Sequence, residues 1–351
     1  MSLVDRLALT IPLVQAPMAG VSTPALAAAV SNAGGLGSIG VGATDAAGAR
    51  AMIDEVRART DRAFQVNLFV HATPVVDATR EAAWLAWLAP RFAEFDTDPP
   101  ASLRTIYRSF ADDPDMLSML LETTPPVVSF HFGLPPDDVI AALRGRDILL
   151  MATATSPDEA RMIADAGIDA IVAQAIEAGG HRGIFDPVAH DDALGTMALT
   201  RLLARDGALP VVATGGIMDG AGIAAALDLG AFAAQLGTAF IACPESAADD
   251  AYRAALLGDG GRHTTLTSLI SGRPARALAN RFTALDPAGR APPDYPIAYD
   301  AGKALNAAAK ARGEHGFGAQ WAGQGAPLAR PMPAADLVAT LRAELAAARV
   351  N

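Results

Sequence analysis

The chain has 351 residues, of which 51% are hydrophobic and 19% are charged, a composition typical of folded globular proteins and far from that of disordered chains. Its 27 basic and 38 acidic residues give a net charge of −11, which disfavours nucleic acid and anionic membranes as partners and favours small molecules. A single cysteine, Cys243, excludes an internal disulfide and a multi-cysteine metal site and fits a reducing compartment.

Neither a leader nor a membrane span is predicted. Residues 1–17 lack the basic segment and the long apolar run of a signal peptide. The apolar stretch 215–244 is interrupted by Asp219, Asp228 and Gln235, so it is not a spanning helix. We therefore expect a cytoplasmic protein.

Short apolar segments alternate along the chain with Ala- and Leu-rich helical patterns, and several of these helices end near a glycine. The predicted strands are residues 13–17, 35–40, 64–69, 126–132, 147–152, 169–174, 210–215 and 231–237. Their interiors are continuously apolar, as in parallel strands that are covered on both faces. Eight such strands predict an α/β fold, a (β/α)8 TIM barrel.

Two segments interrupt this alternation. A helical, aromatic insertion occupies residues of about 70–125 after the third strand, within a barrel domain of residues 1–245. Residues 246–335 form an extension that is rich in Gly, Pro and Arg, and both segments are candidate lids over the catalytic face. In residues 336–351, Leu337, Leu341 and Leu345 have helical spacing and predict a closing helix that packs on the barrel.

Polar residues and glycines follow the predicted strands, where a barrel carries its active site. The pairs Gly215-Gly216 and Gly237-Thr238 follow the last two strands and can bind a phosphate through bare backbone N–H groups, although each pair alone could simply form a tight turn.

The amides of Asn67, Gln174 and Gln235 also follow strands. They can both donate to and accept from a flavin edge, or they can be buried and satisfied within the protein. His181, in the glycine-rich segment 179–183, is the leading catalytic candidate. His131 lies among aromatic residues, where a core histidine is common, but it stands at a strand end.

The sequence lacks the motifs of several other kinds of active site. No pair of histidines or carboxylates has metal-ligand spacing, so we predict no metal. Ser22 and Ser271 lack a nucleophile elbow. The glycine run 34–40 precedes and occupies a strand, whereas a dinucleotide fingerprint follows one, so we interpret the run as structural.

The motifs QAPMAG (15–20), GGLG (34–37), NLF (67–69), EAGGHRG (177–183), ATGGI (213–217) and QLGTAF (235–240) together resemble the nitronate monooxygenase family, formerly called 2-nitropropane dioxygenases. The resemblance runs from about residue 11 to 303 and extends to the branch that oxidises propionate 3-nitronate. It implies a barrel that binds FMN and oxidises alkyl nitronates with O2 to a carbonyl compound and nitrite.

The resemblance also implies roles for individual residues. His181 becomes the catalytic residue. The implied FMN contacts are Ala16, Pro17, Met18, Asn67, Gln174, Gly179, Gly180, Gly215, Gly216, Gln235, Leu236, Gly237 and Thr238. The implied substrate contacts are Tyr107, His131, Tyr252, Tyr295, Tyr299 and Lys303.

A nitronate anion suits phenol and ammonium donors. Tyr295, Tyr299 and Lys303 are four residues apart, a spacing that places them on one face of a helix. The partners expected are a small nitronate and O2, in a monomer or homodimer.

Other functions stay open on the same barrel. The alternative is an NAD(P)H-dependent flavin reductase acting on quinones or enoyl thioesters, which are relatives of similar sequence. A non-catalytic flavin-binding module has less need of His181 and the tyrosines. A phosphosugar barrel without flavin would be expected to carry catalytic lysine or acidic residues at the strand ends, where amides are found instead.

Overall fold

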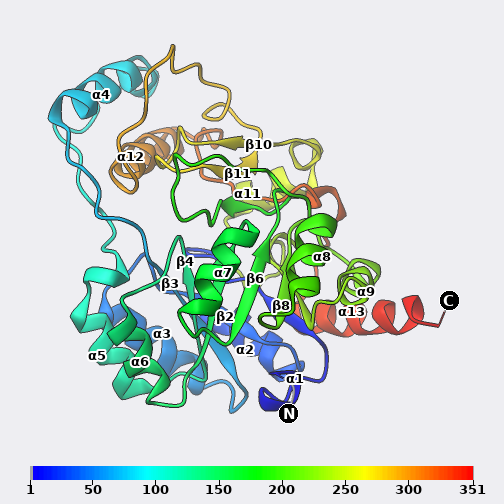
Figure 1. Cartoon of the computed structure of the whole chain (residues 1–351). Coiled ribbons are helices and arrows are strands. Elements are labelled where there is room, and N and C mark those ends of the chain that lie inside the picture. The colour runs from blue at the N-terminus through cyan, green and yellow to red at the C-terminus, as the bar shows by residue number, and fades with distance from the viewer. Residues whose placement is uncertain (1–2, 351) are drawn as a thin grey trace.

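The computed structural model describes residues 3–350, and its centre is a nearly closed barrel of eight parallel strands (Figure 1). The strands are β1 (Leu13–Gln15), β2 (Gly37–Gly40), β3 (Phe64–Phe69), β4 (Val127–His131), β5 (Leu149–Ala154), β6 (Ala170–Gln174), β8 (Val211–Thr214) and β9 (Ala233–Leu236). They are hydrogen-bonded in the order β1-β9-β8-β6-β5-β4-β3-β2, and a parallel bridge between Val14 and Leu36 joins the two ends. The predicted eight-stranded barrel is confirmed.

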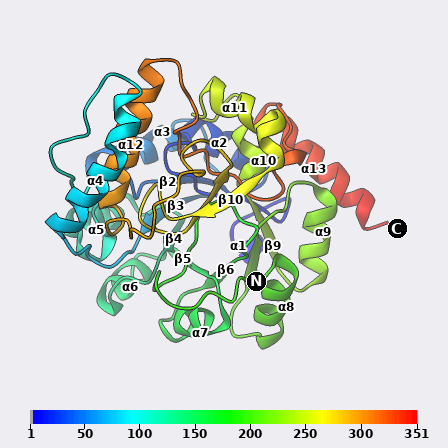
Figure 2. The same ribbon diagram turned by 90° about the horizontal axis from the view of Figure 1, so that it is seen from above.

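Helices surround this barrel when it is viewed along its axis (Figure 2). The ring consists of α2 (Pro24–Asn32), α3 (Ala46–Arg57), α5 (Pro114–Thr123), α6 (Asp137–Arg144), α7 (Pro157–Asp165), α8 (Thr196–Asp206) and α9 (Gly220–Asp228). The short helix α1 (Leu3–Arg6) lies near the centre of this view, over one end of the barrel, and the short helix α10 (Thr238–Ile241) follows the last strand. Several begin at a side-chain cap; Ser156, for example, accepts a hydrogen bond from the N–H of Glu159 at the start of α7.

The glycines that end helices have a structural role. Gly34, Gly167 and Gly230 follow α2, α7 and α9 with φ of 97°, 75° and 105°, a left-handed conformation that glycine adopts without strain. A Cβ on Gly37 would overlap the backbone carbonyl of Ala27, so α2 lies directly against β2. The run 34–40 is therefore a packing element, as predicted.

The insertion after β3 divides into two parts. Its second half, α5, packs against α3 and α6 and is a member of the ring. Only the part with α4 (Ala78–Ala93) and the 3-10 turn η1 (Phe110–Asp112) is added to the barrel. Trp84 and Phe92 of α4 share an apolar cluster with Phe282 and Leu305 of the C-terminal extension, so the two added segments pack together at one end of the barrel (Figure 1).

The extension carries a small sheet that the sequence did not predict. It contains α11 (Asp250–Leu257), η2 (Asp259–Arg262), β10 (Thr264–Thr267), β11 (Ala275–Leu278), α12 (Ile297–Ala311) and η3 (Ala326–Leu328). β11 pairs antiparallel with β10 and with the two-residue strand β7 (Gly180–His181), which follows β6. The extension is thereby joined to the loop that holds His181.

The final helix, α13 (Ala334–Ala348), returns to the side of the barrel and packs on α9 and α2. Leu337, Leu341 and Leu345 are buried there, as their spacing predicts. Within residues 3–350, no helix combines the length and the apolar character that a membrane crossing requires.

Candidate active site

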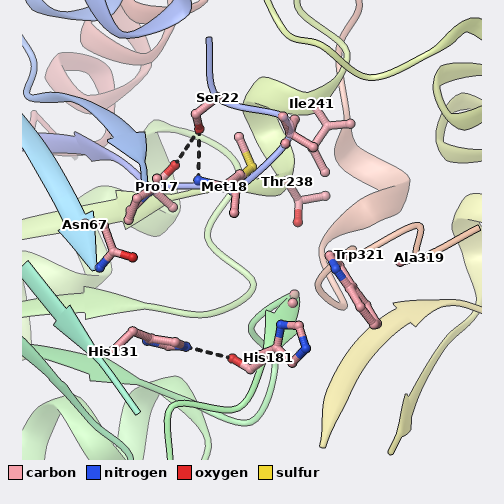
Figure 3. A pocket seen from close by; sticks show the side chains of 18 of the residues that line it. Pro17, Met18, Ser22, Asn67, His131, His181, Thr238, Ile241, Ala319 and Trp321 are labelled. Atoms are coloured by element: carbon pink, nitrogen blue, oxygen red, sulfur yellow. Dashed lines mark hydrogen bonds between the residues drawn. The ribbon is translucent and has the colours of Figure 1, made fainter. Parts of the chain in front are cut away.

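A cavity of about 730 Å3 opens where the barrel strands end, and the extension forms its far wall (Figure 3). Its lining includes every predicted site residue except Leu236: Ala16, Pro17, Met18, Asn67, Tyr107, His131, Gln174, Gly179, Gly180, His181, Gly215, Gly216, Gln235, Gly237, Thr238, Tyr252, Tyr295, Tyr299 and Lys303. Leu236 belongs to the apolar core between the barrel and α13. Because neighbouring strand residues point to opposite faces, Gln235 reaches the cavity and Leu236 does not.

The ends of β8 and β9 offer backbone donors to the cavity. Gly215 and Gly216 have φ of 129° and 67°. A Cβ on Gly215 would lie 2.9 Å from both Ala175 Cβ and Thr196 Oγ1. The N–H groups of Gly216, Ile217 and Gly237 donate to no other described residue. Free N–H groups on closely approachable backbone are what an anion such as phosphate needs.

The three predicted amides are not equivalent. Gln235 Oε1 is buried and has no hydrogen-bond partner. Asn67 donates from Nδ2 to Ser129 Oγ at 2.8 Å, and its side-chain Oδ1 accepts from no described residue. Gln174, in contrast, donates to the carbonyl of His181 at 2.9 Å and accepts from Gly183 N at 2.7 Å. Gln235 and Asn67 can therefore accept from a ligand, whereas Gln174 holds the segment that contains His181.

The segment after β1 is shaped by residues that the sequence reasoning did not identify. Ser22 Oγ accepts from Met18 N at 2.9 Å and from Gln15 Nε2 at 2.8 Å. These bonds fold residues 16–18 against the cavity (Figure 3). A Cβ on Gly237 would lie 3.3 Å from Ala16 Cβ, so this segment and the end of β9 are in close contact.

His181 is fixed through both its backbone and its ring. Its carbonyl accepts from Gln174 Nε2 at 2.9 Å and from His131 Nε2 at 3.2 Å (Figure 3). Its ring Nε2 lies 2.9 Å from Ser271 Oγ, which comes from the extension. Burial, with smaller contributions from His131 and Arg273, lowers the pKa of His181 to about 3, so the imidazole is neutral near pH 7.

His131 lines the cavity, but both of its ring nitrogens have protein partners. Nδ1 lies 3.0 Å from Thr153 Oγ1, and Nε2 donates to the His181 carbonyl. Burial lowers the pKa of His131 to about 4. The geometry therefore favours a role in holding His181 over direct donation to a substrate.

Phenols and one ammonium group line the wall formed by the insertion and α12. Lys303 Nζ lies 4.9 Å from the ring centre of Tyr107 and 5.4 Å from that of Tyr299. Burial raises the pKa of Tyr107 to about 12 and raises the pKa of Tyr295 and Tyr299 as well, so all three phenols stay protonated. The Tyr295 hydroxyl is buried without a partner.

The expectation that Tyr295, Tyr299 and Lys303 share one helix face is wrong for Tyr295. Helix α12 begins at Ile297, after Pro296, so Tyr295 reaches the cavity from the turn before the helix. Proline at a helix start is the sequence signal that would have shown this boundary.

Trp321 is a lining residue that the sequence reasoning missed. Its ring centre lies 5.0 Å from that of His181 and 6.3 Å from that of Tyr299 (Figure 3). The Tyr252 hydroxyl donates to the Trp321 carbonyl, so Tyr252 has no proton left for a substrate and instead secures this segment. No signal in the local sequence distinguishes Trp321 from a tryptophan of the hydrophobic core.

The two arginines of segment 268–276 lie outside the cavity lining and anchor the extension to the barrel. Arg273 donates to the carbonyl of Ile184 and stacks 4.3 Å over the ring of Phe132. Arg276 donates to the carbonyl of Ile176 at 3.0 Å. These contacts give both arginines a structural role.

These features define an α/β-barrel enzyme with a cofactor-sized cavity at the strand ends. Among the described residues, no group of three or more His, Cys, Asp and Glu side chains is placed to hold a metal ion. The family model described as nitronate monooxygenase matches residues 2–344. The chain belongs to the nitronate monooxygenase family, a family of oxidoreductase enzymes.

Individual relatives agree with this assignment. A nitronate monooxygenase from Paraburkholderia phytofirmans is 63% identical over 98% of this chain and 94% of the relative. One from Pseudomonas aeruginosa is 59% identical over 95% and 96% of the two chains. The solved structure of a nitroalkane oxidase from Streptomyces ansochromogenes is 42% identical with a TM-score of 0.90, covering 99% of both chains. FabK from Thermotoga maritima is more distant, at 29% identity and a TM-score of 0.74 over 99% and 96% of the chains.

Proposed function

We propose that this member of the family uses FMN to oxidise alkyl nitronates such as propionate 3-nitronate with O2, giving a carbonyl compound and nitrite. One observation supports this above others: a single cavity has free backbone donors at one end and phenol and ammonium donors at the other. The first set suits a phosphate group and the second set suits an anionic substrate.

The residues at the barrel end of the cavity fit FMN. Gly215, Gly216, Gly237 and Thr238 would hold the phosphate. The unpartnered Oε1 of Gln235 and the free Oδ1 of Asn67 would accept from N–H groups of the flavin ring. When bound, FMN supplies the electron transfer between nitronate and O2.

The remaining FMN contacts are proposed from the same lining. Ala16, Pro17 and Met18 would pack on the ring, and Gly179 and Gly180 line the same cavity and would lie beside FMN. Gln174 contributes indirectly, through the His181 segment that it holds.

The residues at the other end fit a small anion. Lys303 carries a positive charge beside two phenol rings, and the protonated hydroxyls of Tyr107, Tyr295 and Tyr299 are donors at neutral pH. Charge-assisted hydrogen bonds from such groups are stronger than neutral ones. Propionate 3-nitronate, with a nitronate and a carboxylate, offers two anionic groups to this wall.

His181 acts as the catalytic residue in this proposal. Because its imidazole is neutral near pH 7, it can accept the α-proton of a neutral nitroalkane and convert it to the nitronate. Its fixed backbone and the surrounding aromatic rings keep it oriented toward the cavity. A nitronate that is already deprotonated does not need this step.

Oxygen consumption and nitrite formation test the function. Purified protein loaded with FMN is given propionate 3-nitronate in an oxygen electrode, and NADH is given in a parallel cell. We expect O2 uptake with nitrite release from the nitronate and negligible uptake with NADH. Efficient oxidation of NADH without turnover of nitronate would instead establish the reductase alternative, for which the similarity to FabK is the specific observation.

We also propose a cytoplasmic location and a monomeric or homodimeric state. The proposed division of the chain is a barrel of residues 1–245, a lid of residues 246–335 and a closing helix of residues 336–351. Light scattering of the purified protein determines the oligomeric state directly.

A further inference from the structure

We propose that Ser271 is a positioning residue that fixes the tautomer of His181, with the proton on Nε2 and the lone pair of Nδ1 presented to the cavity. The proposal rests on the catalytic role assigned to His181 above. Ser271 comes from the extension and acts only through its contact with His181.

The argument starts from the single proton of the Ser271 hydroxyl. Ser271 is fully buried, and its Oγ has three neighbours: the carbonyl of Arg273 at 3.2 Å, the N–H of Arg273 at 3.4 Å and Nε2 of His181 at 2.9 Å. The Arg273 carbonyl can only accept, so the hydroxyl proton is directed to it. The oxygen is then left as an acceptor for both nitrogens.

The opposite arrangement leaves a buried group unpaired. If Ser271 donated to His181, the Arg273 carbonyl would lose this partner, and no other described residue donates to it. Arg273 is only 3% exposed, and a buried carbonyl without a donor is unfavourable. Nε2 of His181 therefore carries the proton.

The second ring nitrogen faces the site. Nδ1 of His181 has no hydrogen-bond partner among the described residues, and it is not one of the buried unpartnered atoms. Figure 3 shows the ring at the edge of the open space shared with Asn67, Thr238 and Trp321. A lone pair at this position can accept a proton from a substrate.

Aromatic neighbours hinder a flip of the imidazole, which would exchange Nδ1 with a carbon. The ring centres of Phe132, Tyr295, Tyr299 and Trp321 lie 5.7, 5.3, 5.9 and 5.0 Å from that of His181. The ring position is therefore set by packing, and the position of its proton is set by Ser271.

The proton transfer that this tautomer permits is balanced. The C–H bond next to the nitro group breaks, its proton goes to Nδ1, and its electron pair forms the C=N bond of the nitronate while the negative charge moves to the nitro oxygens. The products are a nitronate and an imidazolium. A donor N–H at Nδ1 could not take part in this step.

Nitrogen-15 NMR of histidine-labelled, FMN-loaded protein tests the proposal without depending on turnover. The His181 signals are identified by their loss in His181→Gln. We expect a protonated Nε2 and an unprotonated Nδ1 in the native protein, and a shift of the proton toward Nδ1 in Ser271→Ala. Ser271→Thr retains the hydroxyl and should retain the native tautomer. A native protein with the proton on Nδ1, or an unchanged tautomer in Ser271→Ala, would overturn the proposal.

Kinetics supply a second readout. Ser271→Ala should lower kcat/KM for neutral nitroethane about tenfold or more, while kcat/KM for preformed ethyl nitronate stays within about twofold. The flavin spectrum and Tm of each variant report whether it is folded. Equal losses on both substrates in a folded variant would contradict the assignment. If the native protein does not turn over nitroethane, the proposed base function of His181 fails, and the NMR result still decides the tautomer.

Discussion

The two ends of the cavity are built in different ways. The end beside β8 and β9 consists of backbone from a short stretch of the barrel, and its free donors are main-chain N–H groups of residues such as Gly216 and Gly237. The opposite end consists of side chains that come from the insertion, β7, α12 with the turn before it, and the segment around Trp321, which are far apart in sequence. The first end is therefore sensitive to added Cβ atoms, whereas at the second end individual chemical groups can be removed one at a time.

The largest effect is expected from removing the imidazole at the side-chain end. His181→Asn should reduce kcat/KM for neutral nitroalkanes by about 10²-fold or more, the usual contribution of a general base. Binding of FMN, measured by fluorescence titration, should change little because the backbone donors remain. A variant that loses FMN and activity together would contradict the separation of the two ends.

Adding one methyl group tests the backbone end. Gly215→Ala introduces a Cβ at φ of 129° that would lie 2.9 Å from Ala175 Cβ, so we expect FMN affinity to fall about tenfold or more. The control is Gly313→Ala, which has φ of 77° with no atom within 4 Å of the new Cβ. FMN titration of both variants should separate them; similar affinities would show that FMN binding does not depend on the close packing of the turn at Gly215.

Two lysines of α12 provide a matched pair at the side-chain end. Lys303 contacts two phenol rings, whereas Lys310 is paired with Asp249. Lys303→Met should raise KM for propionate 3-nitronate about tenfold, because it removes a charged donor, with a smaller change in kcat. Lys310→Met should change KM by no more than about twofold. If Lys303→Met and Lys310→Met changed KM and kcat equally, Lys303 would not be a substrate contact.

The pH dependence of stability is the mildest effect. Burial lowers the pKa of His131 to about 4 and of His181 to about 3, while the unfolded chain binds these protons near pH 6.5. The contribution of the two neutral histidines to the free energy of unfolding is thus fully present above pH 6.5 and is lost as the pH falls toward 4. The loss is at most about 1.4 kcal/mol per pH unit for each histidine. Urea unfolding between pH 7 and 4.5 should show a steeper decline for the native protein than for His131→Gln. Parallel declines would argue against the lowered pKa of His131.

The barrel and its glycines could be predicted from the sequence because both depend on local patterns. Continuous apolar runs such as the one in predicted strand 147–152, which the structure places at Leu149–Ala154, indicate buried parallel strands, and Gly34, Gly167 and Gly230 mark the helix ends. Because the carboxyl ends of parallel strands share one face of a barrel, the residues that follow them could be assigned to one cavity.

The partners inside the site could not be predicted. Ser271 meets His181 across 90 residues of sequence, and a two-residue strand such as β7 has no recognisable period. The free acceptor of Gln235 and the fully paired amide of Gln174 differ only through tertiary contacts. Leu236 is different, because strand alternation alone would have placed it in the core.

The central claim is that one cavity holds FMN against the barrel and a nitronate against the extension. The most direct test is a visible spectrum of FMN-loaded protein under anaerobic conditions, before and after addition of propionate 3-nitronate or NADH. We predict protein-bound flavin bands that are bleached by the nitronate and unchanged by NADH. Bleaching by NADH alone, or failure of the protein to bind FMN, would contradict the account.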